Sequence, residues 1–152
     1  NLRFPLWKDR EMLRQTVLQF LPLSHILKIS EEELEFLTGT PDVEAALPQL
    51  LRGDVQLVLY TCGSRGACAY TRSTSGFAPS QKVTAVDTTG AGDGFIGSFL
   101  WQLCRDGVTV DKLGRLSRKK LQEYLAFSNR FCGISVQSHG AMDSYPTLEQ
   151  MQ

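Results

Sequence analysis

The chain has 152 residues, 42% of them hydrophobic and 21% charged, which is the composition of one ordinary folded domain. Sixteen basic residues balance sixteen acidic ones, and this balance argues against a nucleic-acid binder and against a surface built for anionic membranes. We find no apolar run as long as a membrane span, no signal-peptide pattern and no C-x-x-C pair among the four cysteines. We therefore expect a cytoplasmic protein with reduced thiols.

The first third of the chain predicts helices that alternate with a strand. Apolar residues recur at helical spacing over 9–21, and a short apolar run at 25–29 predicts a strand. Ser30 and Glu33 have the S-x-x-E spacing of a capping box, which predicts that a helix begins there. Another helix is expected with Pro41 in its first turn, although Pro48 should disturb it.

The rest of the chain continues this alternation. A largely buried strand is expected at 55–61, followed by a turn and by short strands at 67–71 and 76–86. A glycine-rich turn at 90–94 leads into an apolar helical pattern, and a connection over 106–117 precedes a long helix over 118–137 that should be covered on two sides. Strands that alternate with helices predict a layered α/β fold with binding loops at the carboxyl ends of the strands. We find no repeat and no linker, and treat the chain as one unit.

The glycine-rich turn is the main candidate for an anion site. Loops that lead into a helix N-terminus present free N–H groups and a partial positive charge, and glycines allow close approach to an anion. The segment 92–97 fits G-x-G-x-x-G and Asp111 lies near the distance of a ribose-binding acid, so an NAD(P)-binding Rossmann-type oxidoreductase is one alternative. It is disfavoured because the sequence predicts mainly another helix where a Rossmann unit needs a second strand. The Walker pattern G-x-x-x-x-G-K-[ST] does not occur.

Asp93 places a carboxylate inside this turn. It would repel a passively bound phosphate unless it faces an incoming hydroxyl, and phosphoryl transfer needs one acceptor for the hydroxyl proton beside donors that stabilise the phosphoryl charge. On the residues alone, a catalytic base and a carboxylate that merely caps the helix are equally good interpretations.

The run 86–95, V-D-T-T-G-A-G-D-G-F, resembles the C-terminal signature D-T-x-G-A-G-D of the ribokinase-like, PfkB-type carbohydrate kinases and matches every fixed position. The resemblance extends from about residue 1 to about residue 147. It implies a ribokinase-like layered α/β/α fold in which 1–152 is the C-terminal nucleotide-binding and catalytic part, without the N-terminal sugar-binding part and lid. It also implies that Asp93 is the base and that an anion hole is formed by the amides of Gly90, Ala91 and Gly92.

The resemblance further implies a structural monovalent cation, expected to be potassium. Asp87 and Thr89 resemble two of its ligand positions, although the spacing at Asp87 fits an Asx-type turn cap equally well. Near the C-terminus the site would be completed by Ser135, Ser138, Gly140 and Ser144.

Three further elements resemble nucleotide and metal sites of the family. Ser30 and Glu33 are similar to the N-x-x-E element, with serine at the asparagine position as in fructokinase-like members, and Glu33 would organise magnesium and its waters. A pure capping box needs no metal, and this alternative stays open. The family's T-x-G-x-x-G turn, which lies along the nucleotide phosphates and ribose, is matched by Thr61, Gly63 and Gly66. The same spacing also fits an ordinary hairpin turn.

Asn129 matches a position beside the adenine, and its alternative role is a polar side chain bonded within a buried helix. Asn1 and Arg3, with 6–7, resemble the N-x-R-x-x-L-W stretch of fructokinase-type members. The function expected from the resemblance is ATP-dependent phosphorylation of a sugar hydroxyl, with fructose as the sugar and ATP, Mg²⁺ and K⁺ as cofactors. The expected partner is the missing N-terminal part, without which the chain should be inactive. A homodimer is a possible assembly, and no nucleic acid or membrane is expected. The non-enzymatic alternative, a nucleotide-binding module, is disfavoured by the intact Asp93.

Overall fold

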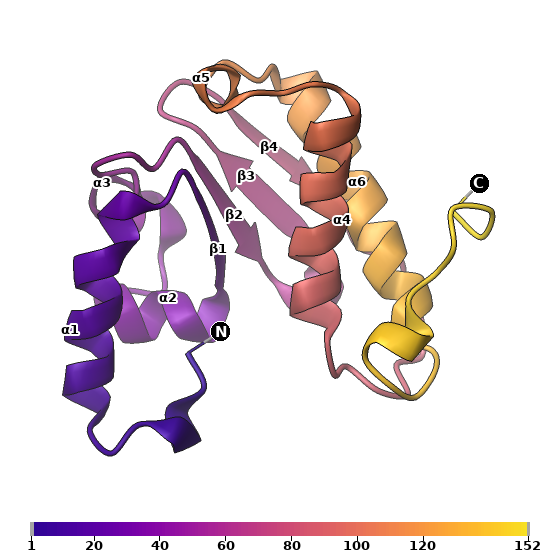
Figure 1. Ribbon diagram of the computed structural model, residues 1–152, viewed down its shortest axis with the longest axis horizontal. Coiled ribbons are helices and arrows are strands. Elements are labelled where there is room, and N and C mark those ends of the chain that lie inside the picture. The colour runs from indigo at the N-terminus through magenta and orange to yellow at the C-terminus, as the bar shows by residue number, and fades with distance from the viewer. Residues whose placement is uncertain (1, 152) are drawn as a thin grey trace.

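A mixed four-stranded sheet is the middle layer of the structure, a computed structural model that describes residues 2–151 (Figure 1). The strands are β1 (Ile26–Ser30), β2 (Leu57–Thr61), β3 (Ala67–Tyr70) and β4 (Ser75–Ala78), and they lie in the order β1-β2-β3-β4. β1 and β2 are parallel, with Ser30 opposite Thr61, whereas β2, β3 and β4 pair antiparallel. The parallel pair therefore brings the carboxyl ends of β1 and β2 to one edge of the sheet.

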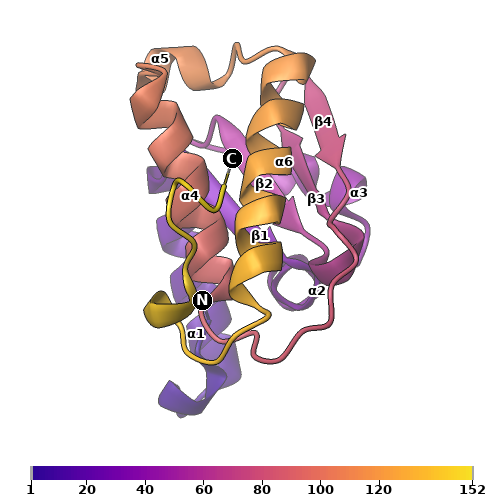
Figure 2. The same cartoon turned by 90° about the vertical axis from the view of Figure 1, so that its right-hand side faces the viewer.

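Helices cover both faces of the sheet (Figures 1 and 2). One face carries α1 (Arg10–Phe20), α2 (Glu31–Thr38) and α3 (Val43–Leu50). The other carries the side-by-side helices α4 (Ala91–Arg105) and α6 (Arg118–Ser135), which the short α5 (Val110–Leu113) connects. The layered α/β/α arrangement expected from the sequence is confirmed.

Alternation along β2 explains the two hydrophobic cores. Leu57 and Leu59 are buried in the core beneath α4 and α6, whereas Val58 and Tyr60 are buried in the core beneath α1, α2 and α3. Successive side chains of a strand point to opposite faces, so a central strand covered on both sides must be apolar throughout. The prediction of a largely buried strand is confirmed, although its pairing begins at Leu57.

The prolines account for two differences from the predicted elements. Pro41 precedes the N-cap Asp42 of α3, and Pro48 lies inside this helix without ending it. Pro48 lacks the N–H that would bond the carbonyl of the exposed Glu44, which lies near the helix start where water can solvate it. The predicted strand at 76–86 is wrong beyond Ala78, because Pro79 cannot donate to a ladder and the segment after it is irregular and mostly exposed.

The helices at the two ends of the pattern agree with their predictions. α1 begins after Asp9, whose carboxylate accepts from the N–H groups of Glu11 and Met12. α6 ends at Ser135, two residues before the predicted end. Among residues 2–151 we find no helix long and apolar enough to cross a membrane.

Candidate active site

A cleft of about 390 Å³ opens where β1 ends and α4 begins. Its walls come from the N-terminal stretch, the β1–α2 junction and the loop before α4 together with the first turn of that helix. The lining includes Arg3, Ser30, Glu33, Thr89, Gly90, Gly92 and Asp93. The structure thus brings the predicted base, two of the anion-hole residues and the predicted magnesium carboxylate to one cavity.

The first turn of α4 presents backbone donors to this cleft. Gly90 is the N-cap with φ 78°, a left-handed conformation that glycine adopts without steric cost. Its carbonyl accepts the N–H of Gly94 at 2.8 Å, and the N–H of Ala91 donates to the Thr88 carbonyl at 3.1 Å. Among the described residues the N–H groups of Gly90 and Gly92 donate to no backbone or side-chain group. Two of the three predicted amides are therefore available to an anion, and that of Ala91 is engaged.

Asp93 is the third residue of α4, and its side chain is exposed on the cleft wall. A carboxylate in the first turn is stabilised by the positive end of the helix dipole, as the capping interpretation requires. The exposure is also what a base needs, because the proton that it takes must come from a bound molecule. The geometry is compatible with both roles.

Glu33 is held on the same wall by a complete capping box. The Ser30 hydroxyl accepts the Glu33 N–H at 3.3 Å, and Oε2 of Glu33 accepts the Ser30 N–H at 2.9 Å. Lys28, on β1, places its Nζ 3.4 Å from the same oxygen. Burial raises the pKa of Glu33, but the Ser30 N–H and the Lys28 charge outweigh it and hold the pKa below its usual value. The cap is thus real, and it leaves an ionised carboxylate beside the cleft.

Asp87 uses both carboxylate oxygens for backbone hydrogen bonds. Oδ1 accepts the Thr89 N–H at 2.9 Å, and Oδ2 accepts the Gly140 N–H at 3.1 Å. Hydrogen bonds from Thr89, then Gly140, lower the pKa of Asp87 to about 2. The Asx-type turn, left open by the sequence, is present, and the same side chain ties the loop to the segment after α6.

The other predicted cation ligands gather at this junction. The hydroxyls of Ser135 and Ser144 lie 2.8 Å apart, and the Ser138 N–H donates to the Ser135 carbonyl at 3.3 Å. The described residues contain no group of three or more His, Cys, Asp or Glu side chains that could hold a metal ion. Beside the Asp87 carboxylate, a cation here would therefore depend on hydroxyl and main-chain oxygens, and the site stays a prediction.

The predicted nucleotide turn follows β2 at the same sheet edge. Thr61 ends β2 opposite Ser30, and Gly63 and Gly66 have φ of 52° and 117°. A Cβ on Gly66 would lie 2.2 Å from the Ala78 carbonyl, so this backbone approach requires glycine. Arg65 of the turn forms an ion pair with Glu31 at the start of α2. This ion pair therefore connects the turn after β2 to the junction of β1 and α2.

Asn129 has a structural role that the sequence only partly indicated. Its side chain is 6% exposed and donates to the carbonyls of Ala78 at 2.8 Å and Pro79 at 3.3 Å. It therefore joins α6 to the end of β4 instead of bonding within its own helix.

Arg3 and Tyr145 lie near the loop before α4, one in an unusual backbone conformation and the other in contact with the loop backbone. Arg3 lines the cleft with φ 51°, a conformation that costs a non-glycine residue energy. Asn1, its predicted companion, lies outside the described residues. Tyr145, which sequence reasoning missed, donates its hydroxyl to the Gly90 carbonyl at 2.8 Å. Only the fold brings Tyr145 and Gly90 together, and no sequence motif marks the tyrosine.

Comparison with known proteins decides the family. A model described as pfkB family carbohydrate kinase matches residues 1–148. The chain belongs to the pfkB family of carbohydrate kinases. This pfkB chain is 40% identical over 148 residues to fructokinase-1 of Oryza sativa subsp. japonica, covering 97% of the chain and 44% of that relative. It is equally similar to fructokinase-1 of Zea mays, with 40% identity over 148 residues, and the coverage is again 97% and 44%.

Solved structures give the same family picture. The fructokinase from Xylella fastidiosa with bound ATP has a TM-score of 0.88 and 28% identity, covering 99% of this chain and 48% of that one. The fructokinase from Vibrio cholerae O395 with fructose, ADP and calcium ion has a TM-score of 0.81 and 30% identity, covering 97% and 46%. The pfkB chain thus spans less than half the length of these relatives.

The Rossmann alternative is not supported. The segment 92–97 lies inside α4, and in the described part of the chain α5 and α6 follow it with no further strand. Asp111 lies in α5, where its carboxylate accepts the Thr109 hydroxyl at 2.6 Å. The G-x-G-x-x-G spacing of this pfkB chain therefore reflects a helix that begins with glycines.

Proposed function

We propose that the full-length protein phosphorylates a sugar hydroxyl with ATP, with fructose as the sugar and residues 1–152 as its nucleotide-binding and catalytic part. The observation that carries the proposal is the exposed carboxylate of Asp93, which shares one cleft with Glu33 and the Gly90 and Gly92 amides. Family membership and the fructokinase relatives support the substrate class.

In the proposed reaction Asp93 accepts the proton of the sugar hydroxyl as its oxygen attacks the γ-phosphorus of ATP. The bond between this phosphorus and the β,γ-bridging oxygen breaks, and ADP leaves. The amides at the start of α4 would stabilise the negative charge of the transferring phosphoryl group, in the manner of an oxyanion hole. Asp93, once protonated, would release its proton to solvent.

The remaining cofactor contacts are proposed for residues around the cleft and the neighbouring loops. Glu33 would hold Mg²⁺ through waters, because its carboxylate is ionised and carboxylates are preferred magnesium ligands. The turn with Thr61, Gly63 and Gly66 would follow the phosphates and ribose, and the α6 segment around Asn129 would lie near the adenine. K⁺ would order the loop between Asp87 and the end of α6. A cytoplasmic location and a homodimer stay predictions.

Replacing Asp93→Asn in the full-length protein tests the base. The amide cannot accept the proton, so kcat should fall by about 10²- to 10⁴-fold, while ATP affinity should change little. The measurement is ADP release over a panel of sugars, together with titration calorimetry for ATP. Near-normal turnover of the variant would refute the role of Asp93, and a wild-type protein that consumes no ATP with any sugar would refute the activity itself.

A further inference from the structure

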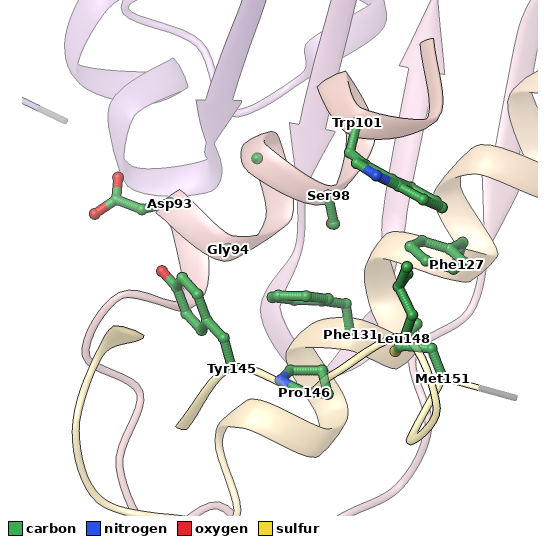
Figure 3. Close-up of a pocket in the computed structure, with 11 residues that line it drawn as sticks. Asp93, Gly94, Ser98, Trp101, Phe127, Phe131, Tyr145, Pro146, Leu148 and Met151 are labelled. Atoms are coloured by element: carbon green, nitrogen blue, oxygen red, sulfur yellow. The ribbon is translucent and has the colours of Figure 1, made fainter. Parts of the chain in front are cut away.

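Tyr145 lies against the first turn of α4, the turn that carries Asp93 (Figure 3). It follows the short 3-10 turn Met142–Ser144, in the segment after α6. Its hydroxyl donates to the Gly90 carbonyl at 2.8 Å, and this oxygen also accepts the Gly94 N–H at 2.8 Å. The Gly90 carbonyl oxygen therefore accepts two hydrogen bonds, one from the first turn of α4 and one from a residue 55 positions further along the chain.

The ring of Tyr145 packs against the same turn. A Cβ on Gly94 would lie 3.1 Å from Cε1 of Tyr145 and 3.1 Å from the Phe131 ring. A Cβ on Gly90 would lie 3.1 Å from the Tyr145 hydroxyl. Phe131 of α6 meets the tyrosine ring edge-on, with ring centroids 5.2 Å apart. Tyr145 thus contacts both ends of the first turn and is itself supported from α6.

The surroundings keep the Tyr145 hydroxyl a neutral donor. Tyr145 and Asp93 line the same apolar hollow of about 310 Å³, and the hydroxyl is directed towards the first turn of α4 (Figure 3). Burial, together with the negative charge of Asp93, raises the pKa of Tyr145 above its usual value. At neutral pH the hydroxyl therefore retains its proton for the Gly90 carbonyl.

This anchor matters because Gly90 has little conformational preference of its own. Its left-handed φ of 78° is one of several that glycine adopts readily. The Gly90 carbonyl and the Ala91 N–H belong to one peptide unit, so the bond from Tyr145 restrains the tilt of that unit together with the bonds to Gly94 and Thr88. The tilt in turn sets the direction of the neighbouring Gly90 and Gly92 amides and of the Asp93 side chain.

We propose that Tyr145 is a positioning residue, whose hydroxyl fixes the Gly90 peptide and thereby aligns the anion-binding amides and Asp93 for phosphoryl transfer. The inference rests on the proposed kinase function for its catalytic consequence. Its structural content, the restraint of residues 90–94, is independent of that function. A misalignment of about 1 Å at a reacting group can cost two orders of magnitude in rate, so a single hydrogen bond here has kinetic weight.

The matched pair Tyr145→Phe and Tyr124→Phe in the full-length protein tests the proposal. Each change removes one hydroxyl and keeps the ring, and Tyr124 donates to Oδ2 of Asp106 at 2.9 Å at the opposite end of α4. That end is about 22 Å from the start of the helix. We expect Tyr145→Phe to lower kcat about tenfold with little change in the KM for ATP. Tyr124→Phe should leave kcat unchanged, although it should shift the melting temperature by about as much as Tyr145→Phe does.

Amide hydrogen exchange provides the second measurement. Tyr145→Phe should speed the exchange of the hydrogen-bonded Ala91 and Gly94 amides relative to wild type, and Tyr124→Phe should not. Unchanged kcat and unchanged exchange in Tyr145→Phe would overturn the proposal, as would an equal loss of kcat in both variants, which would indicate general destabilisation. If wild type phosphorylates no sugar, the kinase function and the catalytic consequence fail together, whereas the exchange comparison still decides whether Tyr145 restrains the turn.

Discussion

Asp106 shows how one side chain holds two helices together at the end of the molecule away from the cleft. It follows α4, and its carboxylate accepts from Arg105 at 2.7 Å, Lys120 at 2.7 Å and Tyr124 at 2.9 Å. A negative charge at a helix C-terminus opposes the helix dipole, so its two cationic partners are needed there. The hydrogen bond from Arg105, then those from Lys120 and Tyr124, hold the pKa of Asp106 well below its usual range.

Asp106→Asn should lower the melting temperature by a few degrees at neutral pH, because the amide keeps the shape and loses the charge. The folded-state pKa is depressed, so the ionised carboxylate contributes stability that is fully present above about pH 4 and is lost as the pH falls below it. The difference between wild type and variant, followed by urea unfolding from pH 7 to pH 3, should therefore shrink on acidification. A difference that grew at low pH would contradict the depressed pKa.

Single residues near the cleft show what the sequence cannot specify. Asp93 and Glu33 are predicted from motifs, and the structure brings both to the wall of one cleft. The Asn129 bonds to the end of β4 and the Tyr145 bond to Gly90 both depend on segments distant in the chain. No local pattern encodes such contacts, and they emerge only when the sheet and helices are assembled.

At the scale of elements, the turn after β2 has two glycines with different reasons to be there. Gly66→Ala would place a Cβ 2.2 Å from the Ala78 carbonyl at φ 117°, and should destabilise the protein by about 2 to 4 kcal/mol. Gly63→Ala is the matched control, since its Cβ would meet nothing within 4 Å and only its φ of 52° is unfavourable. It should cost about 1 to 2 kcal/mol. Equal losses in chemical denaturation would show that the Ala78 contact is unimportant.

Elements with local signals were predictable, and those shaped by their neighbours were not. The capping box at Ser30 and the amphipathic run of α1 carry their own start and period, and both are confirmed. β4 is shorter than predicted because Pro79 stops the ladder and Asn129 takes the Ala78 carbonyl that a longer strand would use. The strand predicted at 76–86 continued past this point and therefore had the wrong end.

At the scale of the whole molecule, the sheet has an open edge. Among residues 2–151, β1 pairs only with β2, and its half-buried Ile26 and Leu27 lie along that edge. The fold class was predictable because alternation of strands and helices leaves few layered arrangements. Which strand would lie at the edge followed from no local pattern, since burial of a strand does not reveal its neighbours.

The 152 residues made as a protein by themselves should therefore differ from the full-length protein. Unpaired strand edges promote self-association, and under the proposal that these residues are one part of a longer kinase the cleft without the other part should hold a nucleotide weakly. We expect ATP affinity at least about tenfold lower, no measurable sugar phosphorylation and concentration-dependent association in sedimentation experiments. Turnover equal to that of the full-length protein would show that the chain needs no further part.

The carboxylate of Asp87 spans 53 positions of sequence to reach Gly140. The stretch between α6 and Gly140 is exposed at 137–139, whereas among residues 2–151 none beyond Asp93 lines the cleft. A protease that cut this stretch would leave every residue of the cleft wall chemically intact. It would, however, weaken the hydrogen bond between Asp87 and Gly140, which ties the loop before α4 to the segment after α6. Inactivation by such a nick would originate in a lost tether and not in a lost catalytic group.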